Sequence, residues 1–320
     1  MSPPPTTRHG VRSSWATIPA ATRERIDAIA GARVVQAQNV QGGFSPGPAA
    51  RCTLDDGRTV FVKAAGVELN PTSPSIHRRE GEVLASLDAS APSPRLIGMA
   101  DDGDWVALVI EWIDGHMPVA PHGPADVERI LRLVEHLATT EGDDTLQPCL
   151  DAHPGLAGHW GALLTEPAAG LDAWSLLHLE ELADLEHDAA EAVHGDRLVH
   201  MDLRSDNIIF ATVGEQHDVA VDWPGASLGA PWVDLVGVLP ALELDGGPPP
   251  EELFGRHPLG RVADPEAVTI YVAAMAGYFT RMALMAPPPG LPTVRAFQAA
   301  QGAIARRWLG ARCGWAPATT

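Results

Sequence analysis

One loop of the sequence carries three side chains whose types and spacing suit proton transfer and cation binding. His200, Asp202 and Asn207 form the pattern H-x-D-x-x-x-x-N between two apolar runs. A carboxylate in such a loop can accept a proton from an alcohol, and the nearby amide oxygen can ligate Mg²⁺. The pattern alone is only moderately specific, because the same residue types also cap ordinary turns.

A second carboxylate follows at the end of the next apolar run. Asp222 comes after residues 219–221, and the polar turn 214–217 separates that run from the one that begins at Asn207. Two strands joined by this turn bring Asn207 and Asp222 side by side, and an amide beside a carboxylate suits a hard cation that keeps waters and bridges phosphates. Asp234 lies in the first turn of a further helix, where it either caps that helix or bonds the His200 loop.

The chain contains one lysine, Lys63, among its 22 Lys and Arg residues, and this lysine lies inside the apolar run 60–64. Where only charge matters, arginine can replace lysine, so a surviving lysine indicates a position that needs a compact point charge, such as a phosphate contact. The alternative is that one lysine remains by chance.

The order of these features resembles a known family. A lysine strand, a helix glutamate, H-x-D-x-x-x-x-N and then D-W-x-x-A-x-x-G-x-P-x-x-D-L are similar, over roughly residues 33–244, to the aminoglycoside phosphotransferase-like small-molecule kinases. The resemblance implies a bilobal, protein-kinase-like α+β fold, with ATP and Mg²⁺ as cofactors. It also implies transfer of a phosphoryl group to a hydroxyl of a small molecule.

The resemblance assigns roles residue by residue: the catalytic aspartate is Asp202, the Mg²⁺ ligands are Asn207 and Asp222, and the phosphate-binding lysine with its ion-pair partner is Lys63 with Glu80. Glu82 is the rival partner, but the helical spacing to Leu84 and Leu87 fits Glu80 better. Arg204 either reaches the transferred phosphoryl group or lies on the surface. The backbone around Glu111 and Ile113 resembles the hinge that bonds the adenine edge.

Departures from the protein-kinase pattern help to separate a small-molecule kinase from a protein kinase. Gly43, Phe44 and Ser45 lie in a glycine-containing loop that allows a close phosphate approach, but Pro46 supplies no N–H, and a plain hairpin loop explains the segment nearly as well. No Ala-Pro-Glu segment or long activation loop follows before residue 234, which favours a small-molecule kinase over a protein kinase. A nucleotide-binding regulatory pseudokinase is disfavoured because each catalytic position is filled.

The secondary structure that must position these residues is predicted to be mostly strands in the first third of the chain and mostly helices after it. The first third predicts an antiparallel sheet from strands over 33–40, 49–54, 59–64, 95–99 and 105–112, with one main helix over 75–87. Long helical patterns then cover 125–139, 172–194, 232–242, 263–286 and 294–309, interrupted by short strands over 207–211 and 218–221 and by Pro/Gly-rich connections over 153–170 and 245–260. We expect a nucleotide-binding lobe over 1–112 and a helical catalytic and substrate-binding lobe over 113–320.

Composition sets the class of protein. The 320 residues are 45% hydrophobic and 20% charged, which excludes a disordered chain, and the net charge of −19 argues against nucleic acid or a membrane surface as a partner. The three cysteines are too scattered for a disulfide framework, and the N-terminus lacks an apolar signal region. The longest apolar stretch, 267–286, contains Arg281 and predicts a buried helix. We therefore expect a cytoplasmic enzyme.

The acceptor is the least defined part of the function. The family resemblance and the acidic front section favour a polycationic acceptor, such as an aminoglycoside or a related amine-bearing antibiotic or natural product, with a role in antibiotic resistance. No acidic side chain follows Glu266, however, whereas five arginines do: Arg281, Arg295, Arg306, Arg307 and Arg312. These offer no carboxylate to an amine, so another small alcohol is the alternative.

Overall fold

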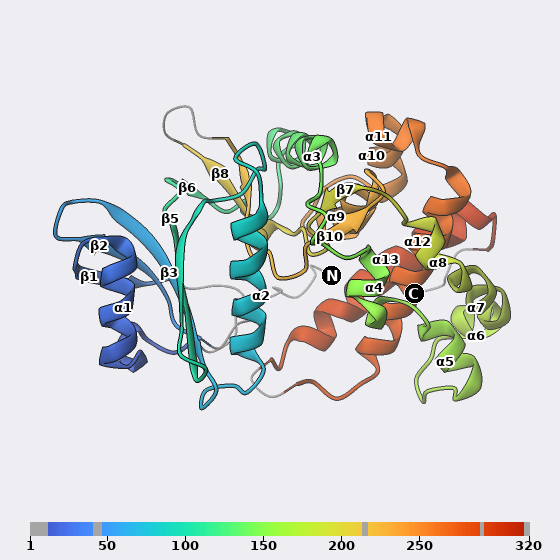
Figure 1. Cartoon of the computed structure of the whole chain (residues 1–320). Coiled ribbons are helices and arrows are strands. Elements are labelled where there is room, and N and C mark those ends of the chain that lie inside the picture. Colours follow the sequence, from blue (N-terminus) through green and yellow to red (C-terminus); the bar gives the residue numbers. More distant parts are fainter. Residues whose placement is uncertain (1–11, 41–46, 213–216, 289–290, 317–320) are drawn as a thin grey trace. The chain divides into compact units, whose positions relative to one another are not determined.

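The structure is a computed structural model that describes residues 12–40, 47–212, 217–288 and 291–316 (Figure 1). The chain divides into two compact units. The sheet unit comprises Thr7–Met117 and Asp206–Pro224, and the helical unit comprises Pro118–Ser205 and Gly225–Thr320. The segment 206–224 therefore belongs to the unit of the N-terminal strands, although helices of the other unit precede it in the sequence.

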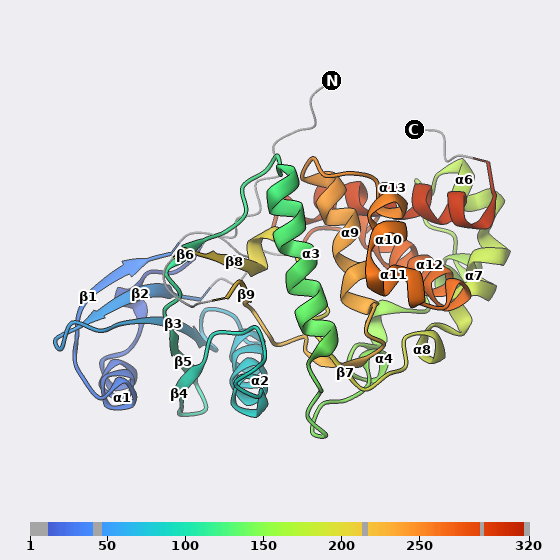
Figure 2. The ribbon, with the colours of Figure 1, turned by 90° about the horizontal axis from the view of Figure 1, so that it is seen from above.

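The sheet unit is built on a five-stranded antiparallel sheet with the order β1-β2-β3-β5-β4 (Figure 2). Its strands are β1 (Val34–Asn39), β2 (Ala49–Leu54), β3 (Thr59–Gly66), β4 (Leu96–Asp101) and β5 (Trp105–Glu111). The central strands read as nearly continuous apolar runs because both faces of the sheet are covered by helices. Their bounds agree with the strands predicted from sequence to within two residues.

Two helices pack on opposite faces of this sheet (Figure 1). Helix α1 (Ala20–Ala30) contributes Ile26 to a core cluster that includes Val62 and Val109. Helix α2 (Ser73–Ser86) packs on the other face, where a Cβ added at Gly81 would lie 2.8 Å from the Leu108 side chain. Because side chains alternate along a strand, Lys63 faces α2 while its neighbours in β3 face α1.

A second, three-stranded sheet in the same unit has the order β6-β8-β9. It consists of β6 (Gly115–His116), β8 (Ile208–Ala211) and β9 (Val219–Ala220). Strands β8 and β9 pair antiparallel, and the N–H of Val221 continues the ladder by donating to the carbonyl of Asn207 at 2.9 Å. This pairing places Asn207 and Asp222 at the same end of the hairpin, as the sequence predicts.

The helical unit contains most of the helices. They are α3 (Pro124–Thr139), α4 (Cys149–Ala152), α5 (His159–Thr165), α6 (Ala173–Leu177), α7 (Leu179–His187), α8 (Ala189–Ala192), α9 (Val233–Leu244), α10 (Pro250–Arg256), α11 (Pro258–Val262), α12 (Pro265–Ala283) and α13 (Val294–Cys313). The buried helix α9 and the long pair α12 and α13 form its centre. The short strands β7 (Arg197–Val199) and β10 (Ser227–Gly229) pair antiparallel beside them.

Three predictions for this unit need correction. The helix expected over 172–194 is broken into α6, α7 and α8, the connection expected over 245–260 contains α10 and α11, and the one expected over 153–170 contains α5. The buried side chains of Trp160 and Trp174 belong to the core of this unit. No helix in the described part of the chain combines the length and apolar character needed to cross a bilayer.

Candidate active site

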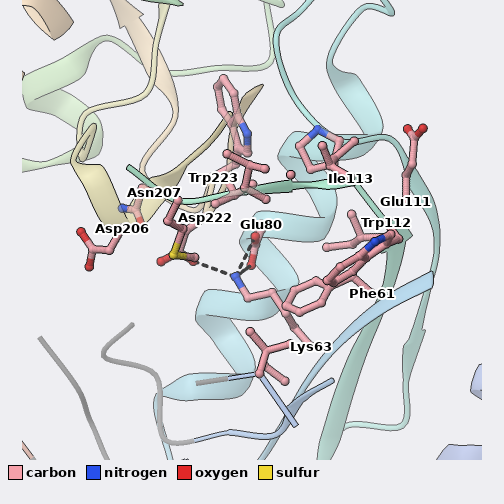
Figure 3. A pocket seen from close by; sticks show the side chains of 18 of the residues that line it. Phe61, Lys63, Glu80, Glu111, Trp112, Ile113, Asp206, Asn207, Asp222 and Trp223 are labelled. Carbon is pink, nitrogen blue, oxygen red and sulfur yellow. Dashed lines mark hydrogen bonds and ion pairs between the residues drawn. The ribbon is translucent and has the colours of Figure 1, made fainter. Parts of the chain in front are cut away.

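Lys63 is the centre of a buried ion-pair cluster in the sheet unit (Figure 3). Its Nζ lies 2.9 and 2.7 Å from the two carboxylate oxygens of Glu80 on α2, and 2.7 Å from Oδ1 of Asp222. Burial lowers the pKa of the Lys63 ammonium, but the two carboxylates outweigh it and hold that pKa above its ordinary value. The only lysine of the chain is therefore a buried, protonated cation.

The two carboxylates around Lys63 differ in their surroundings. The Glu80 side chain is 2% exposed, whereas that of Asp222 is 44% exposed. The N–H of Trp223 donates to Glu80, which ties the start of the D-W motif to α2. Glu80 is thus a fixed structural partner of Lys63, as expected in preference to Glu82, while Asp222 keeps an accessible oxygen face.

Asp222 adopts a left-handed backbone conformation, with φ of 70°. Positive φ is disfavoured for residues with a Cβ, although aspartate tolerates it better than most. This turn ends the β9 ladder directly after Val221 and directs the carboxylate toward Lys63. The geometry of one backbone position thus decides which way the second carboxylate points.

A cavity of about 280 Å³ opens over this cluster, and all residues that line it belong to the sheet unit. Its apolar walls come from β2, β3, β5, α2 and the β8–β9 hairpin, and include Ala49, Phe61, Leu84, Ile110, Ile209 and Val221. One end holds Lys63 with its carboxylates, and another holds the segment after β5 (Figure 3). An apolar slot that ends at a cation suits a nucleotide base joined to phosphates.

The predicted hinge residues Glu111 and Ile113 both line this cavity. The Glu111 N–H donates to the Arg95 carbonyl at 2.9 Å, and its carboxylate accepts from the Arg95 N–H at 3.3 Å, so this segment is held at the end of β5. Trp112 between them donates from Nε1 to Asp114 at 2.8 Å. The candidate phosphate-loop residues Gly43, Phe44 and Ser45 lie outside the described residues.

Asn207 and Asp222 supply an amide and a carboxylate to the same cavity. Among the described residues, no group of three or more His, Cys, Asp or Glu side chains is arranged to hold a metal ion by itself. Two oxygen donors beside a phosphate-sized space suit Mg²⁺, which usually takes one or two protein ligands and completes its shell with waters and phosphates. The residues therefore fit a cation that arrives with a nucleotide.

The H-x-D loop in the helical unit is held by a buried carboxylate. The backbone N–H groups of His200 and Met201 donate to Asp234 at 2.7 and 3.0 Å. Met201 has φ of 69°, and the N–H of Asp202 donates to Nδ1 of His200 at 3.3 Å. Of the two roles left open for Asp234, the structure thus shows the bond to this loop.

Asp202 projects from this loop with half of its side chain exposed, at 50%. Arg204 forms an ion pair with it, and the guanidinium lies 5.9 Å from the centre of the Phe297 ring on α13. Arg204 therefore contacts the candidate catalytic carboxylate itself.

A second buried cluster holds the C-terminal part of the loop. Ser205 Oγ donates to Asp245 Oδ2 at 2.6 Å, and His122 Nε2 lies 2.8 Å from the same Oγ. Serine, histidine and aspartate here do not form a hydrolytic triad, because the aspartate bonds the serine and not Nδ1 of the histidine. The cluster instead fixes the loop between α9 and the segment before α3.

Sequence reasoning missed two charged residues of the cavity. Asp206 lines it beside Asn207, and its place next to the amide of the motif could have identified it. Arg12 also lines it, although it precedes every predicted element and no motif singles it out. Both add charge at the end of the cavity that holds Lys63.

The site and fold identify the class of protein. A family model described as the phosphotransferase enzyme family matches residues 38–271. The match covers more than half of the chain, so the chain belongs to this family, and the resemblance to aminoglycoside phosphotransferase-like small-molecule kinases is confirmed. No curated protein matches the sequence.

Solved structures share the fold. A choline kinase from Streptococcus pneumoniae is 17% identical, with a TM-score of 0.58 over 88% of this chain and 97% of that chain. An aminoglycoside phosphotransferase from Streptomyces rimosus, in complex with ADP and streptomycin, is 16% identical, with a TM-score of 0.53 over 80% and 98%. Another aminoglycoside phosphotransferase, with AMP-PNP and hygromycin B, is 15% identical, with a TM-score of 0.55 over 92% and 97%. The expected protein-kinase-like α+β fold is confirmed.

Proposed function

We propose that this enzyme transfers the γ-phosphoryl group of ATP to a hydroxyl of a small molecule. The observation that carries the proposal is the cavity in which a buried lysine, an amide and an accessible carboxylate meet at the end of an apolar slot. Complexes of similar structures with ADP and AMP-PNP support a nucleotide in this slot. Hydrolysis by a covalent nucleophile finds no support, because the Ser205/His122/Asp245 cluster is buried and its aspartate bonds the serine and not Nδ1 of the histidine.

The proposed roles follow from the chemistry of phosphoryl transfer. The transition state is loose and highly charged, so catalysis depends on positioning and on neutralising charge. Lys63 would contact the phosphates, and the backbone around Glu111 and Ile113 would bond the adenine edge. If Mg²⁺ accompanies the nucleotide, Asn207 and Asp222 would hold it, and it would supply neutralisation of the phosphate charge.

Asp202 would orient the acceptor hydroxyl and accept its proton as the bond to phosphorus forms. Its exposed carboxylate and fixed loop suit this role, and Arg204 beside it would steady the carboxylate or contact the transferred group. Asp202→Asn should lower kcat by about 10²–10⁴-fold while ATP still binds. The exposed Asp144→Asn in the same unit is the matched control. Full turnover by Asp202→Asn would remove Asp202 from this role.

For the acceptor, we propose an aminoglycoside or a related amine-bearing antibiotic, which would give the enzyme a role in resistance. Similar structures hold streptomycin and hygromycin B, and the chain carries a net charge of −19 that attracts cations.

A second acceptor class is favoured by the surroundings of Asp202. Burial raises the pKa of Tyr278 on α12, with a further rise from Asp202 and opposing effects of Arg295 and Arg204. The ring of His159 packs edge-on against Tyr278 and bonds Arg281. Within the described residues, neither Arg281 nor Arg295 forms an ion pair with a carboxylate. These arginines favour a neutral or anionic alcohol as the second candidate acceptor.

The two acceptor classes are separated by one screen. The protein is incubated with MgATP and with matched sets of aminoglycosides, neutral sugar alcohols and acidic alcohols, and products are examined by mass spectrometry for one added phosphoryl group. Thermal shift in the presence of MgATP ranks the acceptors beforehand. Phosphorylation of amine-free alcohols alone would overturn the amine-bearing acceptor, and labelling of none of them would count against the proposed transfer reaction.

A further inference from the structure

The N-terminal segment brings a second cation to the end of the cavity that holds Lys63. Arg12 lines this cavity together with Lys63, Glu80 and Asp222, and its side chain is partly buried. Burial lowers the pKa of its guanidinium, and the carboxylates of Asp222 and Glu80 oppose that effect. Arg12 therefore lies close enough to the cluster to respond to both carboxylates.

The chain directly after Arg12 is fixed to the sheet. The Trp15 N–H donates to Asn39 Oδ1 at 2.9 Å at the end of β1, and Ile18 is 2% exposed in the core beneath α1. Three residues span at most about 11 Å, so Arg12 is confined to the neighbourhood of this anchor. Val40, next to Asn39, lines the same cavity.

A second cation beside Lys63 would help to balance the negative charge of a bound nucleotide. The single positive charge of Lys63 is shared between Glu80 and Asp222, which are both within 2.9 Å of Nζ. A nucleotide that enters adds several negative charges, and the planar guanidinium donates paired hydrogen bonds that match phosphate oxygens better than a point charge does. An arginine already held near its ligand also loses less conformational freedom on binding.

We propose that Arg12 is a phosphate-binding residue of the nucleotide site, supplied by the segment that precedes the sheet. This inference rests on the proposed function and adds to it a residue that lies before the family match, which begins at residue 38. Two other roles compete with it. The guanidinium could act only as a structural partner of the carboxylates, or it could occupy the phosphate position and compete with the nucleotide.

The three roles give different binding patterns. Arg12→Ala and the similarly sized Arg12→Gln are compared with the wild type by calorimetric titration with ATP, ADP and adenosine, each with Mg²⁺ and no acceptor. A charge-assisted contact to phosphate predicts that both variants bind ATP and ADP about 10- to 100-fold more weakly while adenosine binding stays within about twofold. Arg12→Lys should recover part of the loss.

Arg25→Ala is the matched control, because Arg25 lies in the same unit on α1, pairs with Asp102 at 3.4 Å and does not line the cavity. It should bind all three ligands as the wild type does. Thermal melting of each variant shows whether the fold is retained, and Arg12→Gln tests the proposal if Arg12→Ala does not fold.

Several results would overturn the proposal. Unchanged ATP affinity in Arg12→Gln removes the phosphate contact, tighter ATP binding shows that the guanidinium competes with phosphate, and equal weakening of ATP and adenosine shows a structural role. Failure of the wild type to bind any nucleotide would overturn both the proposed function and this inference. Tight binding by the wild type with no effect of the Arg12 variants would overturn this inference alone.

Discussion

Removing the charge of Lys63 should lower the free energy of unfolding, because the buried carboxylate of Glu80 then has no counter-charge. In Lys63→Met the Glu80 carboxylate, whose side chain is 2% exposed, loses both short contacts to Nζ, whereas Asp222 is 44% exposed and can turn to water. One uncompensated buried charge costs about 3–5 kcal/mol in the free energy of unfolding. For a unit of 100–200 residues this corresponds to a fall in melting temperature of roughly 6–20 °C.

The double variant Lys63→Met/Glu80→Gln separates stability from activity. It removes the buried carboxylate together with its partner, so most of the lost stability should return, with a coupling free energy of at least about 2 kcal/mol. The proposed contact of Lys63 with phosphate stays absent, so kcat/KM should remain about 10- to 100-fold below that of the wild type in both variants. Lys63→Arg should also lose activity, because a guanidinium does not reproduce a compact point contact.

A second ion pair of α2 provides the matched control. Arg78 pairs with Asp101 at 2.6 Å, but their side chains are 34% and 29% exposed. Removal of this pair, by Arg78→Met and Asp101→Asn singly and together, should change the free energy of unfolding far less than Lys63→Met does, because solvent screens an exposed ion pair. Both cycles are measured by urea denaturation and thermal melting, with kcat/KM from a coupled ADP assay.

Two results would refute this reasoning. A Lys63→Met protein that melts within about 1 °C of the wild type would show that Glu80 is not a buried charge held by Lys63. A double variant as unstable as Lys63→Met would show that the loss comes from packing of the lysine stem. Retained kcat/KM in Lys63→Met would separately show that the lone lysine takes no part in binding phosphate.

Three further predictions concern other buried polar groups. Asp234→Ala should cost about 3–5 kcal/mol in stability, because it leaves two buried loop N–H groups without an acceptor, and urea midpoints that match the wild type would contradict this. Burial, aided by the Lys63 charge, lowers the pKa of His77 from 6.5 to about 4, so the free energy of unfolding should fall by about 3 kcal/mol as pH falls from 6.5 to 4. In His77→Gln the free energy of unfolding should depend less on pH over this range. An unchanged slope in this variant would contradict the assignment. Ser205→Ala should lower kcat about tenfold with unchanged ATP affinity, because Ser205 is expected to position the loop without contacting substrate. Ser205→Thr should restore part of the rate. A change in ATP affinity alone would argue against this role.

The sign of the His77 effect follows from which state binds the proton. The folded protein keeps the ring neutral down to about pH 4, whereas the unfolded chain takes up a proton near pH 6.5. Between these values the unfolded state binds more protons, so acid favours unfolding. The ring lies on α2 with Nδ1 3.0 Å from the Ser73 carbonyl, which fixes the neutral tautomer as an Nδ1–H donor.

Much of the sheet unit could be predicted from sequence because its signals are local. Apolar runs set the strands, and the period of two along β3 places Lys63 opposite its neighbours. The contact of Lys63 with Asp222 is not local, since 159 residues separate them. The resemblance to a family assigned both residues to a nucleotide site but did not predict their contact. Only coordinates show this contact, and that both residues line one cavity with Glu80.

Proline explains one error in the helical unit. The connection predicted over 245–260 is rich in proline and glycine, yet it contains α10 and α11, which begin at Pro250 and Pro258. Proline suits the first turn of a helix, where its missing N–H has no partner to lose. In such a segment proline marks where a short helix begins, and composition alone cannot separate this from a loop.

One carboxylate of the segment 172–194 has a role that its place in the helical pattern does not reveal. Glu186 is 3% exposed and accepts the N–H groups of His159 and Trp160 at 2.9 and 2.7 Å. These N–H groups have no partner within α5, so the carboxylate satisfies them from α7. A periodic pattern shows which residues share a helix face, but it does not show which carboxylate is required by the end of another helix.

Two non-glycine residues with positive φ in the described chain, Met201 and Asp222, both lie next to candidate catalytic positions or occupy one. Such a backbone conformation costs about 1–2 kcal/mol and persists only where neighbours enforce it. Asp234 holds the amide of Met201, and Lys63 holds the carboxylate of Asp222. These two contacts therefore maintain two strained turns, and the turns aim the carboxylates of Asp202 and Asp222 before any ligand binds. Pre-aligned charge is what phosphoryl transfer requires, because little rearrangement then remains for the reaction itself.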